Sequence, residues 1–72
     1  MPRVERTEVE SSTIASIGYD GGERILEVEF RNGHIYRYFL VPPLVHRSLM
    51  AADSKGTFLN VRVKGSFGFV RL

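Results

Sequence analysis

The stretch from Leu26 to Tyr38 constrains the fold of this 72-residue chain more than any other segment. It reads LEVEFRNGHIYRY, which is two runs of alternating apolar and polar residues joined by Asn32-Gly33. A period of two is typical of strands that bury one face, and Asn-Gly is a strong hairpin signal. The segment therefore predicts an antiparallel hairpin at the centre of a small β-containing fold.

Two connections compete within this hairpin. A two-residue turn at Asn32-Gly33 would place Phe30 opposite Ile35, whereas a three-residue loop with Gly33 in a left-handed bulge shifts the pairing by one residue. We favour the second register because it sets apolar residues against aromatic ones and a carboxylate against a guanidinium. Its pairs are Leu26 with Tyr38, Val28 with Tyr36, and Glu27 with Arg37. A slip of one residue would turn every side chain to the other face.

The segment before the hairpin predicts a second strand over residues 13–19. Ile14 and Ile17 fall on opposite faces of a regular strand, so the strand is either buried on both faces or kinked, with Gly18 as the candidate bulge. Asp20-Gly21-Gly22 predicts the turn that follows. Residues 1–11 are expected to form a mobile arm, with a short edge strand near residues 6–10, ahead of a single domain at 12–72.

Helices are expected after the hairpin. A helix is predicted over 44–52, and Pro43 fits its first turn. Val45, Leu49 and Ala52 form an apolar stripe on it, which Leu44 and Ser48 widen. His46 is expected to face outward. Residues 57–64 are ambiguous, because Val61 and Val63 favour a strand while Ser54 as N-cap favours a short helix over about 55–62. We favour the helix. With a last strand at 67–72, the order β-β-β-α-(α)-β predicts an α+β domain with an antiparallel sheet and helices on one face.

Composition excludes several functional classes. The chain has no cysteine, which removes disulfides, thiolate zinc sites and thiol nucleophiles. No apolar run approaches the roughly 20 residues of a membrane helix, and the N-terminus is too charged for a signal peptide. We therefore expect a cytoplasmic protein with no membrane partner.

Charge is distributed unevenly along the chain. Residues 1–30 carry three arginines and seven carboxylates, whereas residues 31–72 carry seven basic residues and only Asp53 as an acid. This asymmetry indicates an anionic partner. The alternative is that the acidic and basic parts lie side by side in the fold and neutralise each other.

An ordered set of residues resembles the KTSC domain, named for the C-terminus of some lysyl-tRNA synthetases, over residues 12–71. Its landmarks here are Ser12, Ile14, Ile17-Gly18-Tyr19-Asp20, Leu26, Val28, Phe30, Gly33, Tyr36-Arg37-Tyr38, Val41-Pro42, Ala52, Ser54, Gly56, Asn60, Val63 and Gly65. This chain departs from the pattern at Phe67, where the family commonly has tyrosine. The resemblance implies a small bacterial or phage-related domain of no established function, and its fusion to a synthetase suggests RNA binding by association.

Seven residues are the candidate nucleic-acid site. Tyr36 and Tyr38 share one sheet face and would stack unpaired bases, although the same register favours the alternative that both rings are core. Their proposed partners are the basic residues Lys55, Arg62 and Lys64 together with the neutral Asn60, while Arg37 projects from the opposite face of the sheet. These side chains would bind phosphates largely without regard to sequence, or they form an ordinary solvated surface.

No catalytic or metal constellation emerges. His34 and His46 lack a third ligand at metal-site spacing, and Glu27 with Glu29 reads as a solvated charged face. We therefore expect a non-enzymatic module without cofactor or metal. Its expected partner is RNA or another nucleic acid. The alternative is a protein-interaction or accessory domain that docks on a larger protein or on itself; the sequence does not predict the oligomeric state.

Overall fold

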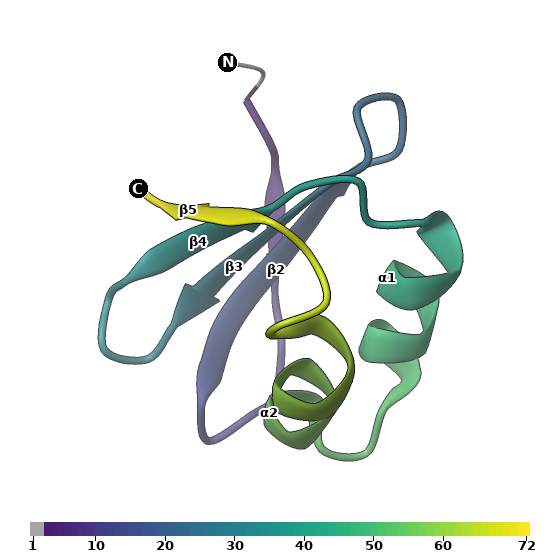
Figure 1. Cartoon of the computed structure of the whole chain (residues 1–72). Helices are drawn as coiled ribbons and strands as arrows, with labels where there is room; N and C mark the ends of the chain where they lie inside the picture. The colour runs from purple at the N-terminus through teal and green to yellow at the C-terminus, as the bar shows by residue number, and fades with distance from the viewer. Residues whose placement is uncertain (1–2) are drawn as a thin grey trace.

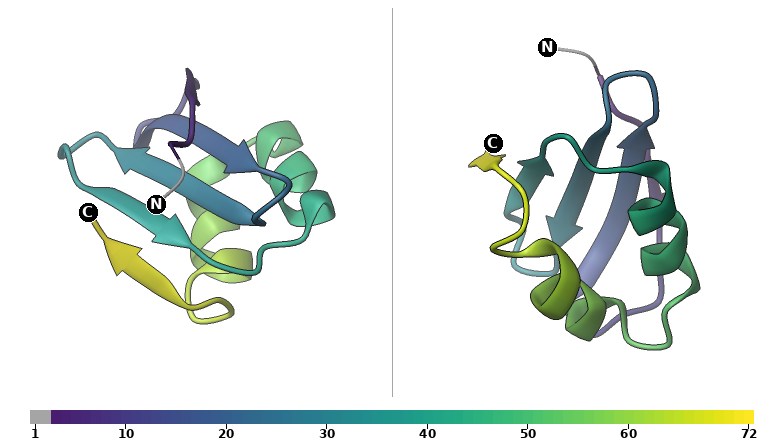
Figure 2. Two further views of the ribbon diagram at one scale, coloured as in Figure 1. Left: turned by 90° about the horizontal axis from the view of Figure 1, so that it is seen from above. Right: turned by 45° about the vertical axis from the view of Figure 1, so that its right-hand side comes forward.

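The computed structural model describes residues 3–72 and consists of one antiparallel sheet covered on one face by helices (Figure 1). The five strands lie in the order β1-β2-β3-β4-β5, so each strand pairs with its predecessor, and β5 joins the edge of β4 after the helical segment. The elements are β1 (Arg6–Glu8), β2 (Ile14–Asp20), β3 (Ile25–Phe30), β4 (Ile35–Tyr38), α1 (Pro43–Ala51), α2 (Lys55–Phe58), the π-helical segment η1 (Leu59–Val63) and β5 (Phe69–Arg71). The views in Figure 2 show both helices on the same side of the sheet, and no helix within residues 3–72 covers the opposite side.

The central hairpin has the predicted three-residue connection. Gly33 adopts a φ of +90°, and the Phe30 N–H donates to the His34 carbonyl at 2.9 Å. The predicted register is confirmed, with the pairs Leu26 with Tyr38, Glu27 with Arg37, and Val28 with Tyr36. The aromatic rings therefore share the helix-covered face with the aliphatic residues of β3.

The irregularity in β2 lies earlier than predicted. The register between β2 and β3 shifts between Ile14 and Ser16, and both Ile14 and Ile17 are buried in the core as a result. The prediction of a bulge at Gly18 was therefore wrong. Gly18 has another role, because a Cβ there would lie 2.3 Å from the Glu5 carbonyl oxygen. The missing side chain lets the N-terminal segment cross close over the sheet.

The sheet begins within the segment assigned to an N-terminal arm. The edge strand expected near residues 6–10 is present as β1, and the Val4 side chain is buried. The sheet therefore has four strands before the helices instead of three. The mobility of the arm stays a prediction.

The helical segment follows the sequence expectation in outline and differs in detail. Ser54 caps α2 by accepting from the Thr57 N–H, and 55–63 is helical as favoured. Leu44, expected to widen the buried stripe of α1, is exposed. His46, expected to face outward, is half-buried and stacks on Tyr19, with ring centroids 4.7 Å apart. No helix in residues 3–72 has the length and apolar character needed to cross a bilayer.

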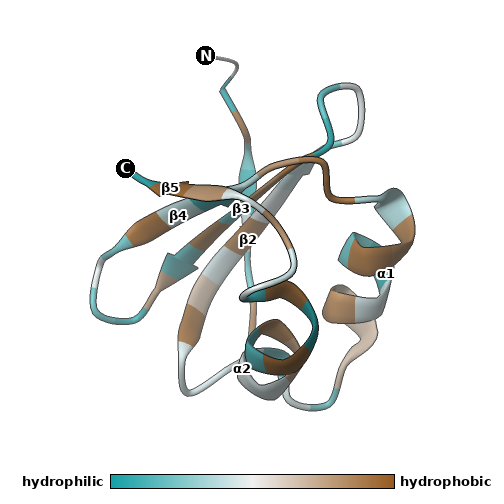
Figure 3. Ribbon diagram, in the orientation of Figure 1, coloured by the Kyte–Doolittle hydropathy of each residue, from teal (hydrophilic) through white to brown (hydrophobic). Residues whose placement is uncertain are grey.

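The core lies between the sheet and the helices. Apolar residues from both layers are fully buried there, and Figure 3 shows the apolar segments of the sheet and the helices facing one another. The principal members are Ile14, Ile17, Leu26, Val28, Tyr38, Val41, Leu49, Leu59 and Val63.

The uncovered face of the sheet is polar, but part of it is not solvated. Glu27 is only 3% exposed, because Arg6 from β1 and Arg37 from β4 each pair with one of its carboxylate oxygens. The prediction that Glu27 and Glu29 form a solvated charged face was therefore wrong for Glu27. The ion pair between Glu27 and Arg37 also joins the acidic first half of the chain to its basic second half, which offsets part of the charge asymmetry.

Candidate functional site

A groove of about 480 Å³ lies on the helix-covered side, bounded by η1, by β5 and by the tip of the β3–β4 hairpin. Aromatic rings form one wall and polar side chains form the rim. The lining residues are Thr13, Phe30, Asn32, His34, Tyr36, Tyr38, Asn60, Lys64, Gly65 and Phe69. Four of the seven predicted site residues meet in this groove: Tyr36, Tyr38, Asn60 and Lys64.

Three rings from β4 and β5 form the aromatic wall. Tyr36 and Tyr38 lie two residues apart on one face of β4, and Phe69 pairs with Tyr38 across the strands. The ring centroid of Tyr36 is 5.6 Å from that of Phe69 and 6.4 Å from that of Tyr38, and the planes of the two tyrosine rings differ by 20°. These distances are within the range of direct aromatic contact.

The two tyrosines have different exposures. Tyr38 is 2% exposed and belongs to the core, whereas Tyr36 is half-buried and Phe69 is 56% exposed. Burial, followed by the nearby Tyr36, raises the pKa of Tyr38 above its usual value of 10.0, so its phenol stays neutral. Tyr38 is therefore a core residue, as the alternative interpretation of its register held, and it is removed from the candidate stacking surface because its ring is enclosed. Accessible aromatic surface is supplied by Tyr36 and Phe69.

The polar rim of the groove comes from the end of the helical segment. Asn60 and Lys64 are four residues apart, and both are exposed. The Lys64 ammonium lies 5.2 Å from the ring centroid of Phe30, which is a cation–π distance. This contact holds a positive charge beside the aromatic wall.

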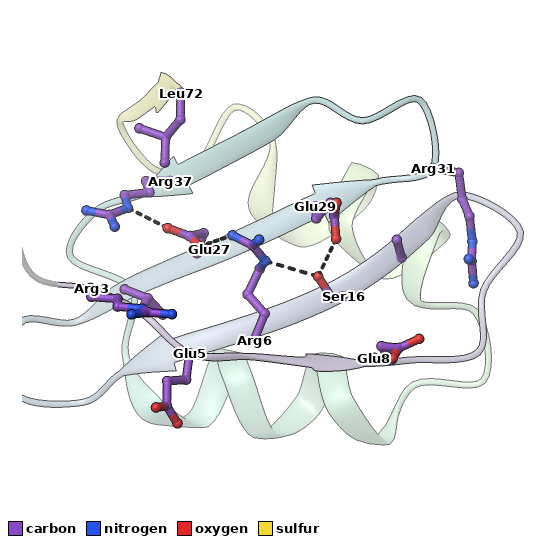
Figure 4. Close-up of a pocket in the computed structure, with 12 residues that line it drawn as sticks. Arg3, Glu5, Arg6, Glu8, Ser16, Glu27, Glu29, Arg31, Arg37 and Leu72 are labelled. Atoms are coloured by element: carbon purple, nitrogen blue, oxygen red, sulfur yellow. Dashed lines mark hydrogen bonds and ion pairs between the residues drawn. The ribbon is translucent and has the colours of Figure 1, made fainter.

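The other three predicted residues lie elsewhere. The Lys55 ammonium donates to the Ala52 carbonyl at 3.1 Å, and Arg62 is exposed outside the groove. Arg37 lies on the uncovered face of the sheet, where its Nε is 2.6 Å from a Glu27 carboxylate oxygen (Figure 4). The predicted cluster of Lys55, Asn60, Arg62 and Lys64 is thus divided, because a helical turn directs neighbouring residues to different sides.

Phe69 and His34 line the groove and were not predicted. Phe69 belongs to a strand whose partner was not assigned from the sequence, and only its pairing with Tyr38 brings it to this wall. The alternation of Phe67, Phe69 and Arg71 along the final strand was the sequence feature that could have indicated the face on which Phe69 lies. His34 was recognised only as a hairpin-tip residue.

The groove combines surfaces that suit a planar ligand carrying polar edges and negative charge. Tyr36 and Phe69 offer ring faces, Asn60 offers both a donor and an acceptor, and Lys64 offers a cation. Within residues 3–72, no group of three or more histidine, cysteine or acidic side chains is arranged to hold a metal ion. The groove thus offers exposed ring faces, a hydrogen-bonding amide and a positive charge.

Comparison with known proteins identifies the domain. A model of the KTSC domain family matches residues 10–67. The crystal structure of a KTSC domain protein from Yersinia pestis has a TM-score of 0.92 and 42% identity, and the match covers 97% of this chain and 99% of that one. The resemblance identified from the sequence and the predicted α+β fold class are both confirmed.

Relatives occur both as small proteins and as segments of larger ones. An uncharacterised protein of Stutzerimonas stutzeri is 47% identical over 57 residues, which are 79% of this chain and 80% of that protein. A lysine–tRNA ligase of Nostoc punctiforme is 41% identical over 63 residues, which are 88% of this chain and 11% of the ligase. This chain therefore corresponds to a small part of that enzyme.

Proposed function

The chain belongs to the KTSC domain family, and we propose that it is a non-catalytic module that binds unpaired RNA in the groove between η1 and β5. The observation that carries the proposal is the convergence of two accessible rings, Tyr36 and Phe69, with the Lys64 ammonium and the Asn60 amide. Unpaired bases stack on aromatic side chains, and a nearby cation neutralises phosphate. A cytoplasmic location remains part of the proposal.

The relatives provide supporting context. Domains similar to this chain form segments of proteins named lysine–tRNA ligase, in which the substrate named is an RNA. A segment that covers 11% of such a ligase is short enough to be an accessory binding part. For this chain, that association favours RNA over other planar anionic ligands.

The test is the affinity for a fluorescently labelled single-stranded RNA, measured by anisotropy at about 50 mM salt and at increasing salt. The expected result is saturable binding whose affinity falls steeply with salt, because counterions are released from the RNA. Absence of binding at low salt would end the proposal.

A matched pair of charge variants locates the site. Lys64→Gln and Arg62→Gln each remove one positive charge, but only Lys64 lines the groove. We expect Lys64→Gln to weaken binding several-fold and to lower the salt slope by about 0.7, as for one phosphate contact on a single strand, with Arg62→Gln close to wild type. Equal loss in both variants would show that binding depends on overall charge instead.

A variant of the ring wall tests stacking. Phe69→Ala removes an exposed ring from a short edge strand, and we expect it to weaken RNA binding by about 1–2 kcal/mol without unfolding the domain. Circular dichroism provides the control for folding. An unchanged affinity would exclude Phe69 from the site.

A second candidate function is self-association, favoured by the apolar edge of the sheet. Among residues 3–72, β5 pairs only with β4, and the exposed fractions of Phe69, Val70 and Leu72 are 56%, 41% and 58%. An exposed edge strand with apolar side chains is a surface that pairs with another strand. Light scattering after gel filtration would test it, since a dimer that Val70→Lys converts to a monomer would support this function.

A further inference from the structure

The uncovered face of the sheet contains a second hollow, of about 710 Å³, on the side opposite the groove (Figure 4). Charged side chains from the N-terminal segment, β1, β3 and β4 line it. The charged members are Arg3, Glu5, Arg6, Glu8, Glu27, Glu29, Arg31 and Arg37. The proposed RNA groove uses none of these residues.

Positive charge is in excess at one end of this hollow. Arg6 and Arg37 share one carboxylate, that of Glu27, which is already bonded at both oxygens. Arg3 lines the same end, while the carboxylate of Glu5 points away from it (Figure 4). Three guanidinium groups thus lie at this end of the hollow, and two of them contact the Glu27 carboxylate.

The two remaining carboxylates lie further along the hollow. Glu29 accepts from the Ser16 hydroxyl at 2.8 Å, which occupies one of its oxygens. Glu8 lies towards the Arg31 end, and the Arg31 Nε donates to the Ser11 carbonyl. Glu29 is linked to the arginine end through Ser16, whose hydroxyl accepts from the Arg6 Nε at 3.1 Å, but among the described residues neither Glu29 nor Glu8 forms an ion pair with Arg3, Arg6 or Arg37.

Arg37 is the group that points to a ligand. Its side chain is 9% exposed, its Nε is used by Glu27, and its buried Nη1 has no acceptor among the residues that the structure describes. Buried guanidinium donors are normally all satisfied, and a planar guanidinium presents paired N–H groups that match the oxygens of an oxyanion. A buried arginine with an unpartnered donor, next to two further arginines, has the donor groups that an oxyanion requires.

We propose that the arginine end of this hollow, formed by Arg3, Arg6 and Arg37 around Glu27, binds an oxyanion of the phosphate or carboxylate type. The guanidinium of Arg37 holds Glu27 through Nε. Its Nη1 is enclosed in this conformation, so binding requires a movement of the surrounding side chains that opens Nη1 to the anion, after which Arg37 bridges Glu27 and the anion. Arg3, which is exposed, closes over the anion from the N-terminal segment. This site extends the function of the domain beyond the groove, because it occupies the other face.

The experiment is an NMR titration with inorganic phosphate, and separately with acetate, at constant ionic strength set by sodium chloride. The Nε–H signals of Arg37 and Arg6 are the readout, together with the backbone amides of β1 and β4. We expect a saturable shift of the Arg37 signal. Tighter binding of phosphate assigns the site to a phosphoryl group, and tighter binding of acetate assigns it to a carboxylate.

Variants separate this site from general charge and from the groove. Arg3→Gln removes an exposed arginine that is outside the Glu27 ion pairs, so the domain is expected to stay folded while phosphate affinity falls at least threefold. Arg31→Gln, at the other end of the hollow, and Lys64→Gln, in the groove, should leave the affinity unchanged. Shifts that rise linearly with concentration, or that persist in Arg3→Gln with the same affinity, would overturn the proposal.

Discussion

Glu27 and Arg37 face each other across β3 and β4, and their buried side chains form an ion pair in which the Arg37 Nε lies 2.6 Å from a Glu27 oxygen. The second Glu27 oxygen pairs with Arg6 of β1. A single carboxylate therefore connects three strands on the uncovered face. The helices stabilise the opposite face by apolar packing, so the two faces of this sheet are held by different forces.

Replacing Glu27 tests the importance of this connection. Glu27→Gln leaves Arg6 and Arg37 without a counter-charge, and we expect the free energy of unfolding to fall by about 3 kcal/mol. Urea denaturation followed by circular dichroism measures it. Glu23→Gln, at an exposed carboxylate in the β2–β3 turn, is the matched control and should change stability by less than about 0.5 kcal/mol. Similar values for the two variants would show that the buried pair contributes no more than a surface charge.

Gly18 predicts a second stability effect. Gly18→Ala would bring a Cβ within 2.3 Å of the Glu5 backbone oxygen, so the N-terminal segment must move away from β2. We expect a loss of about 2–3 kcal/mol. Gly68→Ala is the control, because a Cβ at that position has no neighbour within 4 Å, and this variant should be neutral or slightly stabilising. Thermal unfolding of the two variants compares them directly.

His46 predicts a dependence of stability on pH. Burial against Tyr19 lowers the pKa of His46 below its usual 6.5, so the unfolded chain binds a proton more readily than the folded one. The domain is therefore fully stable above pH 6.5. Its stability declines as the pH falls through 6.5 towards the pKa that His46 has in the folded protein. We expect the urea midpoint to decrease between about pH 8 and pH 5.

Two histidine variants identify the group responsible. His46→Phe keeps a ring against Tyr19 and removes the titration, so its urea midpoint should lose the part of the pH dependence due to His46. His34→Gln, at an exposed position of the β3–β4 hairpin, should retain the wild-type profile. An unchanged pH profile in His46→Phe would contradict the assignment.

The N-cap hydrogen bond of Ser54 is expected to contribute to the stability of the domain. Its side chain accepts from the Thr57 N–H and donates to the Thr57 hydroxyl, so one backbone N–H of the first turn of α2 is satisfied. Ser54→Ala should lower the free energy of unfolding by about 1 kcal/mol. Ser66→Ala, at an exposed serine in the loop before β5, is the control and should have little effect. Equal stability of Ser54→Ala and wild type would show that α2 does not depend on this cap.

The sequence alone was sufficient for the parts of the fold that depend on local periodicity. Alternation in Leu26 to Tyr38, together with Gly33, determined the register of β3 and β4, because a slip of one residue would have exposed every apolar side chain. The cap at Ser54 indicated a helix against the strand propensity of Val61 and Val63, and α2 with η1 is that helix. Each of these features depends on residues that lie close to one another in the sequence.

Only the tertiary structure decided what depends on segments far apart in the chain. The hairpin register predicted Arg37 opposite Glu27, but the burial of Glu27 was not predicted and depends also on Arg6, which β1 brings to it from a distant segment. Phe69 contacts Tyr36 only because β5 lies beside β4. In the same way, the turn of η1 places Lys64 at the groove and leaves Arg62 outside. Burial and charge pairing arise from contacts between distant segments, and a local pattern of residues carries no information about which distant segment will supply the contact.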